Sequence, residues 1–135
     1  MSEYVSTARE GCNTPVGTWK IQASGNSVAK SRTALLSGGS SYAEYLTRFK
    51  GPKCMHTVPY KERQVTGHVN KNQFNKLGSP ASGGCVRMPY KMAKFIYENC
   101  PVGTPVIVYE KANDYPMGKP IKYIATKNID PTYNG

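Results

Sequence analysis

Residues 79–88, SPASGGCVRM, are the most informative stretch of this chain. Cys85 follows two glycines there and stands two residues before Arg87. Glycines let the backbone turn and bring its N–H groups close to a ligand. A cysteine in such a turn is either an exposed nucleophile or a buried structural thiol, and the rest of the chain has to distinguish the two.

Length and composition indicate one globular, mainly β domain. A chain of 135 residues lies within the usual size of a single domain, so we expect residues 1–135 to form one. Hydrophobic residues are 39% and charged residues 19%, which excludes a disordered chain. The 13 glycines, 10 prolines and 10 tyrosines favour a turn-rich β protein. The apolar runs are far shorter than the roughly 20 residues of a membrane helix.

The charge and the cysteines limit the possible partners. A net charge of +10 attracts polyanions, but the basic residues are scattered, which favours a solvated basic surface over a nucleic-acid-binding face. The four cysteines (Cys12, Cys54, Cys85 and Cys100) include no C-x-x-C pair, so a zinc site is poorly supported. We therefore predict no metal, no cofactor and no nucleic-acid partner.

Residue patterns predict several short strands. Alternation of apolar and polar residues favours a strand at 18–22. Residues 42–49 fit helical spacing as well as a strand, but the Gly51-Pro52 turn and a short strand at 54–58 favour a hairpin. A buried strand is expected at 105–109 and one more at 121–125. Residues 24–41 are rich in Ser and Gly and read as an extended loop or irregular hairpin.

Two helices are predicted around the glycine turn. Asn70 is a good N-cap for a short helix over 71–77 that ends at Gly78. Pro89 can open a second helix. Cys85 is then expected on a turn just ahead of this second helix, whose free N–H groups would lower the pKa of the thiol.

A cysteine nucleophile needs a basic or cationic partner, and the chain offers only His56 and His68. His56 lies in a predicted strand that can hold its ring, whereas His68 lies in a polar connection, so local context favours His56 and leaves His68 open. Backbone N–H groups of the turn around Cys85 could form an oxyanion hole. Arg87 could hold a substrate carboxylate.

Several motifs together resemble one known family. Residues 82–88, SGGCVRM, closely resemble the nucleophile motif of L,D-transpeptidases, the YkuD-type catalytic domain, in its Gram-positive form. That motif reads Ser-x-Gly-Cys-(Ile/Val)-Arg-(Met/Leu). Residues 14–19, TPVGTW, resemble the Thr-Pro-x-Gly-Thr-Phe turn of the family, and 55–60, MHTVPY, its His-Ser-x-Pro-Tyr segment. The matches are spread over nearly the whole chain.

The resemblance implies a fold and a set of site residues. The fold would be mainly β, a YkuD-like sandwich or barrel with a helix following the nucleophile turn. Cys85 would be the nucleophile and His56, in preference to His68, the base. The implied roles of the remaining residues are turn shaping for Ser82, oxyanion binding for the amides of Gly84 and Cys85, and substrate binding for Arg87, Gly83 and Tyr60.

The resemblance also implies a reaction and a place for it. The protein would form 3→3 cross-links in peptidoglycan through a cysteine thioester, as an extracytoplasmic, monomeric enzyme of cell wall biogenesis and cell shape. Its partners would be stem peptides and carbapenem-type inhibitors, without a membrane span. Two alternatives remain: an L,D-carboxypeptidase that hydrolyses the same thioester, and a catalytically inactive wall-binding module.

The chain departs from the family pattern at two places. Gly83 stands where a histidine is frequent, so substrate contacts made by that histidine would be missing. Only residues 1–11 precede Cys12, whereas the family usually has one or two strands before its Thr-Pro-x-Gly turn. The sheet edge at the N-terminal side is therefore expected to be incomplete, trimmed or reorganised, and an unpaired edge would be a risk for association.

Overall fold

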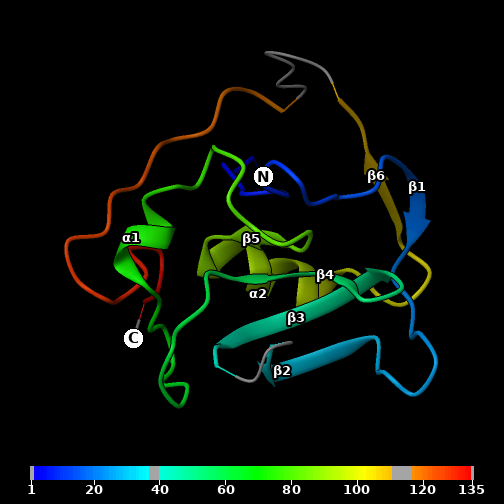
Figure 1. Ribbon diagram of the computed structural model, residues 1–135, viewed down its shortest axis with the longest axis horizontal. Helices are drawn as coiled ribbons and strands as arrows, with labels where there is room; N and C mark the ends of the chain where they lie inside the picture. Colours follow the sequence, from blue (N-terminus) through cyan, green and yellow to red (C-terminus); the bar gives the residue numbers. More distant parts are fainter. Residues whose placement is uncertain (1, 37–39, 111–116, 135) are drawn as a thin grey trace.

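A computed structural model of the protein describes residues 2–36, 40–110 and 117–134 (Figure 1). Its elements in chain order are β1 (Gly17–Lys20), β2 (Lys30–Leu35), β3 (Tyr42–Lys50), β4 (Lys53–Thr57), α1 (Lys71–Phe74), β5 (Val86–Met88), α2 (Tyr90–Asn99) and β6 (Pro105–Val108). The predicted mainly β class is confirmed, and helix α2 follows the turn around Cys85 after the short strand β5. That residues 1–135 form a single domain stays a prediction.

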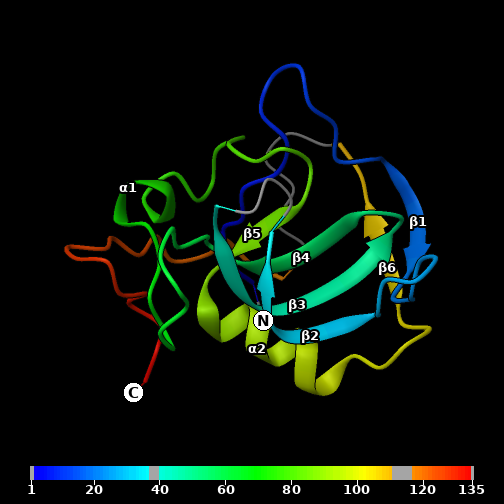
Figure 2. The ribbon, with the colours of Figure 1, turned by 60° about the horizontal axis from the view of Figure 1, so that its bottom comes forward.

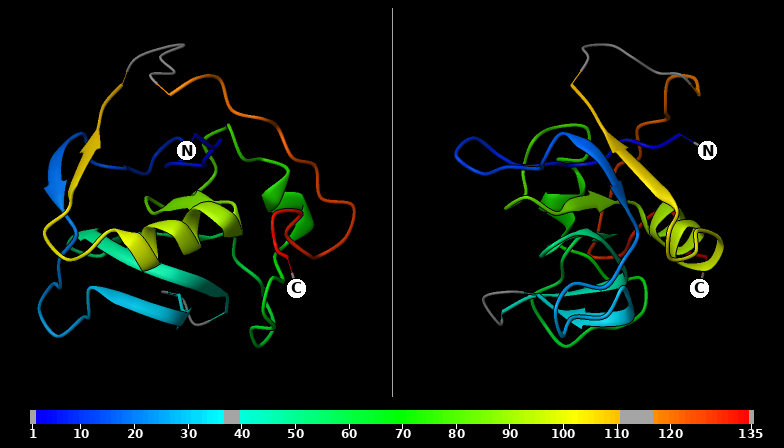
Figure 3. Two further views of the ribbon diagram at one scale, coloured as in Figure 1. Left: turned by 180° about the vertical axis from the view of Figure 1, so that it is seen from behind. Right: turned by 90° about the vertical axis from the view of Figure 1, so that its right-hand side faces the viewer.

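The larger sheet has the strand order β2-β3-β4-β5. Its first three strands pair antiparallel, and β5 runs parallel to β4. Helix α2 packs against β3 and β4 on one face of this sheet, as Figures 2 and 3 show. The core between them contains Ile21, Tyr45, Phe49, Met55, Met88, Tyr90 and Ala93. Strands β1 and β6 pair with each other in a separate two-stranded sheet.

The N-terminal segment covers the edge of the larger sheet at β5 (Figure 1). Ser6 and Arg87 exchange two backbone hydrogen bonds of 2.9 Å each. The carbonyl oxygen of Thr7 accepts from the N–H of Ser82, and the N–H of Arg9 donates to the carbonyl of Ser82. The expectation of an unpaired edge is therefore wrong for β5, and the same contacts fix the loop that leads to Cys85.

Strand β2 lies within the segment expected to be a loop. It is an edge strand of mostly polar, half-exposed residues, so it shows little of the apolar alternation that marks a strand buried on one face. The predicted strand at 121–125 is absent, and these residues are irregular. Ile121 and Ile124 are exposed there, and the backbone of Ala125 pairs with the side chain of Asn75 instead of with a strand.

The remaining elements follow the predictions with two changes. The Asn70 side chain caps α1 by accepting from the N–H of Gln73 at 3.0 Å, as predicted, but the helix ends at Phe74. Strand β6 forms, but it is not buried, because the side chain of Ile107 is 65% exposed in the two-stranded sheet. In the described part of the chain, no helix has both the length and the apolar character needed to cross a bilayer.

Candidate active site

The register of β4 and β5 gathers four functional side chains on one face of the sheet. His56 lies directly beside Arg87, and Met55 beside Val86. Cys54 immediately precedes Met55, and Cys85 immediately precedes Val86. Alternate residues of a strand share a face, so Cys54, His56, Cys85 and Arg87 lie on the face opposite to Met55, which packs in the core.

A cleft of about 350 Å³ lies at this face. Its volume is within the range of small-molecule sites. Its lining consists of Leu36, Pro52, Lys53, His56, Pro59, Ser82, Gly83, Cys85 and Arg87. A second cleft of about 360 Å³ lies between α2 and residues 132–134, but no cysteine or histidine lines it. The first cleft is therefore the candidate active site.

Cys85 does not lie directly ahead of a helix, contrary to the sequence prediction. Strand β5 follows it, and α2 begins only at Tyr90, so the end of a helix does not explain its acidity. The interaction with Cys54 contributes most. Burial acts in the opposite direction, but the interaction with His56 adds to that of Cys54, and the pKa of Cys85 is lowered to about 4. The backbone N–H of Cys54 also donates to Cys85 Sγ at 3.4 Å.

The pKa values of Cys85 and Cys54 are thus shifted in opposite directions. The interaction with Cys85, together with burial, raises the pKa of Cys54 well above its ordinary value. The thiolate is the form of cysteine that attacks. The shifts therefore favour the thiolate at Cys85 and the thiol at Cys54.

His56 is oriented by the backbone. Its side chain is buried, and Nδ1 lies 2.6 Å from the carbonyl oxygen of Thr57. A carbonyl oxygen only accepts, so we assign the proton to Nδ1. This tautomer leaves Nε2 as the nitrogen that can exchange a proton in the cleft, which is the arrangement a general base needs.

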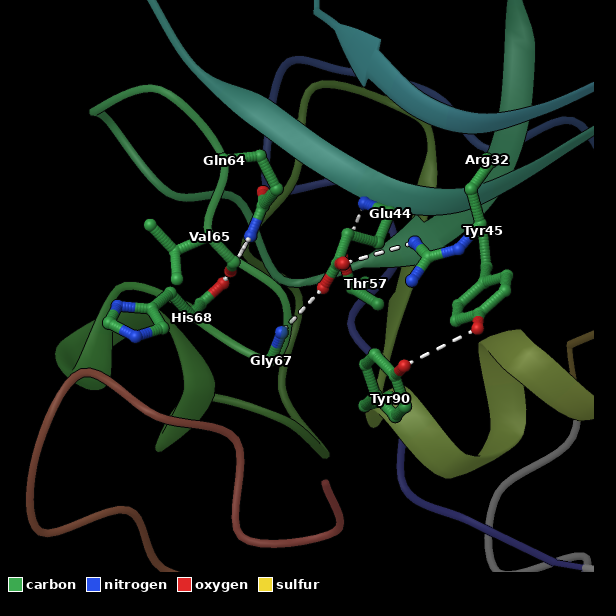
Figure 4. Close-up of polar contacts among 9 residues, drawn as sticks. All are labelled: Arg32, Glu44, Tyr45, Thr57, Gln64, Val65, Gly67, His68 and Tyr90. Carbon is green, nitrogen blue, oxygen red and sulfur yellow. Dashed lines mark hydrogen bonds and ion pairs between the residues drawn. The ribbon is translucent and has the colours of Figure 1, made fainter. Parts of the chain in front are cut away.

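A buried carboxylate supports the strand that holds His56 (Figure 4). The backbone N–H of Glu44 donates to Thr57 Oγ1 at 2.8 Å, which fixes the residue whose carbonyl orients His56. The Glu44 carboxylate is 1% exposed, accepts from the N–H of Gly67 at 2.9 Å and pairs with Arg32 at 3.0 Å. The residue next to His56 is therefore tied to the neighbouring strand β3.

His68 and Tyr60 lie outside the residues that line the cleft. Their rings pack edge-on against each other with a centroid distance of 5.3 Å. The backbone carbonyl of His68 accepts from the side chain of Gln64 (Figure 4). The structure thus brings His56 and not His68 to Cys85, and it does not place Tyr60 against the cleft as the resemblance implies.

Ser82 shapes the turn before Cys85. Its buried hydroxyl donates to the carbonyl of Cys85 at 2.5 Å and accepts from the N–H of Gly84 at 3.1 Å. Thr14 Oγ1 donates to the carbonyl of Gly84 at 2.7 Å, so the 14–19 turn also supports this loop. The Gly84 amide, expected in the oxyanion hole, is therefore already engaged by Ser82.

Two basic side chains line the cleft together with Cys85. Arg87 is half-buried and donates to Gln73 Oε1 at 2.8 Å. Burial holds the pKa of its guanidinium below the ordinary value, and the nearby charge of Arg9 lowers it further. Lys53 Nζ donates to the carbonyl of Gly83 at 3.4 Å at the rim of the cleft. This arrangement favours an anionic ligand.

Two residues of the site were not predicted from the sequence. Cys54 had a usable signal, because it stands two residues before His56 in a predicted strand and must share its face. Lys53 had none, since nothing in the sequence distinguishes it from the other scattered lysines. Within the described ranges, no group of three or more His, Cys, Asp or Glu side chains is placed to hold a metal ion.

Comparisons with known proteins agree on one family. Residues 1–108 match the model of the YkuD family, described as the L,D-transpeptidase catalytic domain. A protein of Bacillus subtilis named "Putative L,D-transpeptidase YciB" is 40% identical over 68 residues, which are 49% of this chain and 34% of that protein.

Solved structures show the same fold. The L,D-transpeptidase from Stackebrandtia nassauensis superposes with a TM-score of 0.56 at 23% identity, covering 78% of this chain and 42% of that one. The L,D-transpeptidase LdtMt1, solved in complex with imipenem, gives a TM-score of 0.61 at 19% identity, covering 81% and 49%. This chain therefore spans less than half the length of each of these relatives.

Proposed function

This chain belongs to the YkuD family of L,D-transpeptidase catalytic domains, and we propose that it forms 3→3 cross-links between peptidoglycan stem peptides through a thioester on Cys85. The observation that supports this most directly is the placement of Cys85. It lines one cleft together with His56 and basic side chains, and interactions with Cys54 and His56 lower its pKa to about 4. These are the features that an acyl-transferring cysteine needs.

The first step transfers an acyl group to the enzyme. The Cys85 thiolate attacks the carbonyl carbon at the L-centre of the diamino residue, diaminopimelate or lysine, in a donor tetrapeptide. The C–N bond to the terminal D-alanine breaks, and His56, which has taken the Cys85 proton at Nε2, gives this proton to the leaving amine. The hydrogen bond from Nδ1 to the Thr57 carbonyl keeps the ring in place during this transfer.

The oxyanion of this step needs backbone donors. A donor aimed at a developing oxyanion typically contributes about 3 kcal/mol. Since the Gly84 N–H donates to Ser82 Oγ, we assign the main role to the Cys85 N–H. Gly84 contributes only when its amide exchanges Ser82 for the substrate oxygen.

Basic residues around the cleft supply substrate binding. Arg87 uses one Nη atom for Gln73, which leaves other guanidinium N–H groups for a carboxylate of the stem peptide. Lys53 offers a second, more mobile cation at the rim. Gly83 lines the cleft without a side chain, so the space that a histidine fills in other family members is open here.

The second step decides between two products. Attack on the thioester by a side-chain amine of another stem gives the 3→3 cross-link, and attack by water gives L,D-carboxypeptidase activity. Either reaction places the protein outside the cytoplasm, at the cell wall, where its net charge of +10 suits anionic wall polymers. We propose that it acts there as a monomer without a cofactor.

A carbapenem tests the nucleophile and the cleft together. Incubation with imipenem, the ligand in the LdtMt1 complex, is expected to add one drug mass to the intact protein. The adduct should disappear in Cys85→Ala and persist in Cys100→Ala, a matched change at another half-buried cysteine. A folded protein that forms no adduct would instead be an inactive wall-binding module.

A tetrapeptide donor separates the two enzymatic readings. With an amine acceptor present, a transpeptidase is expected to form the cross-linked product. Without an acceptor, it should release the tripeptide only slowly. Equal release of free tripeptide under both conditions, with no cross-linked product, would identify a carboxypeptidase.

A further inference from the structure

Two cysteines face each other at the start of β4 and β5. Met55 and Val86 are paired in the parallel register, and Cys54 and Cys85 each precede one of them by one residue. Neighbouring strands lie about 4.7–4.9 Å apart. This spacing falls within the Cα separation of about 4.4–6.8 Å found in disulfides. The backbones therefore need no large movement to allow a bond between the two sulfur atoms.

The side-chain contacts bring the sulfur atoms to one place. Cys54 Sγ lies 3.6 Å and Cys85 Sγ 3.8 Å from the same acceptor, the carbonyl oxygen of Pro52. The N–H of Cys54 also donates to Cys85 Sγ. Both cysteines are free thiols in this structure. The two side chains thus meet on the same face of the sheet, as the register requires.

The two thiols have unequal access to reagents. Cys85 lines the cleft, whereas Cys54 is 2% exposed and is not among the lining residues. A reagent that enters the cleft therefore meets Cys85 first, and Cys54 lies behind it. The acidity of Cys85 supports this order, since its pKa is lowered and that of Cys54 is raised.

We propose that Cys54 is a resolving cysteine that forms a disulfide with Cys85 when a hydroperoxide oxidises the site. The bond makes Cys85 unavailable for acylation and shields it from irreversible oxidation, and a dithiol restores it. The formation of this disulfide does not depend on the proposed function. Its effect on activity rests on the proposed function.

The disulfide forms in two steps. The Cys85 thiolate attacks one oxygen of the hydroperoxide, an S–O bond forms, and the O–O bond breaks. The other oxygen leaves as water or an alcohol after taking a proton, and Cys85 becomes a sulfenic acid. The Cys54 sulfur then attacks the Cys85 sulfur, the S–S bond forms, and the hydroxyl group leaves with the Cys54 proton as water.

Peptide mass analysis tests the linkage directly. The reduced protein is treated with hydrogen peroxide, free thiols are blocked with iodoacetamide, and the protein is digested with trypsin. We expect a loss of about 2 Da from the intact protein and a cross-linked pair of the tryptic peptides 54–61 and 77–87. Linkage of 77–87 to 10–20 or 95–111, which hold the other two cysteines, or Cys85 oxygen adducts without any linkage, would overturn the proposal.

Variants test the protective role. Peroxide should abolish carbapenem labelling of the wild type, and dithiothreitol should restore it. In Cys54→Ser and, as a second variant, Cys54→Ala, the same treatment should leave Cys85 as sulfinic or sulfonic acid that dithiothreitol does not repair. Cys100→Ser should behave like the wild type. If peroxide abolishes labelling of both Cys54 variants and dithiothreitol then restores it fully, the resolving role is contradicted.

The two proposals fail in different ways. If the reduced protein is never labelled by a carbapenem but the 54–61 and 77–87 peptides become linked, the disulfide stands and the transpeptidase function does not. If labelling occurs but no linkage forms under peroxide, the function stands and the resolving role of Cys54 is wrong.

Discussion

Gly84→Ala is the substitution that best tests how the nucleophile loop is built. Gly84 has a φ of +134°, a conformation that side chains with a Cβ rarely adopt. An added Cβ would lie 2.7 Å from the backbone oxygen of Asn13, and it would also press on the Lys53 ammonium group. Lys53 can move, because its side chain is flexible, but Asn13 can move only with its backbone.

The expected cost follows from these two effects. Strained backbone of this kind costs about 1–3 kcal/mol, and crowding against a fixed neighbour costs about 1–3 kcal/mol. We expect Gly84→Ala to lower the free energy of unfolding by about 2–6 kcal/mol, measured by urea denaturation with an unchanged m-value. Carbapenem labelling should slow as well, because Cys85 is the next residue.

Gly83→Ala is the matched control one residue earlier. Gly83 has no left-handed φ, and the nearest atom to an added Cβ is Arg9 Nη1 at 3.8 Å. Its stability should therefore stay within about 0.5 kcal/mol of the wild type. The reasoning is refuted if Gly84→Ala costs less than about 1 kcal/mol, or if the two alanine variants lose the same stability.

Two further predictions concern the same loop. Ser82→Ala removes a buried hydroxyl that hydrogen-bonds two backbone groups, at 2.5 and 3.1 Å. It should lower the free energy of unfolding by about 2–4 kcal/mol. Ser79→Ala, at an exposed position, is the control, and equal unfolding midpoints for the two variants would contradict the role of Ser82. The second prediction concerns pH. The pKa of Cys85 is lowered to about 4, so the thiolate dominates above that pH. In a Cys12→Ala, Cys100→Ala background, the rate of labelling by iodoacetamide should be nearly constant from pH 6 to 8 and should fall as the pH drops through about 4. A rate that rises about tenfold per pH unit between 6 and 8 would indicate an ordinary thiol.

Elements of the fold could be predicted from the sequence where they depend on neighbouring residues. The strand that carries His56 and the Asn70 cap could be predicted because each depends on neighbouring residues. The prediction of β2 failed because an exposed edge strand has no need of apolar alternation. The prediction of a strand at 121–125 failed for the opposite reason: the segment is mostly apolar, but the backbone of Ala125 pairs with the side chain of Asn75 and not with a strand.

Sequence by itself determined the family and the identity of the candidate nucleophile, because the 82–88 motif is contiguous and specific. It could not determine the surroundings of Cys85, which come from segments far apart in the chain. Only the tertiary structure placed Cys54 beside Cys85, set β5 between Cys85 and α2, and engaged the Gly84 amide with Ser82. Parallel pairing of β4 with β5 is the physical reason, since register between distant strands is fixed by the whole sheet and not by either strand alone.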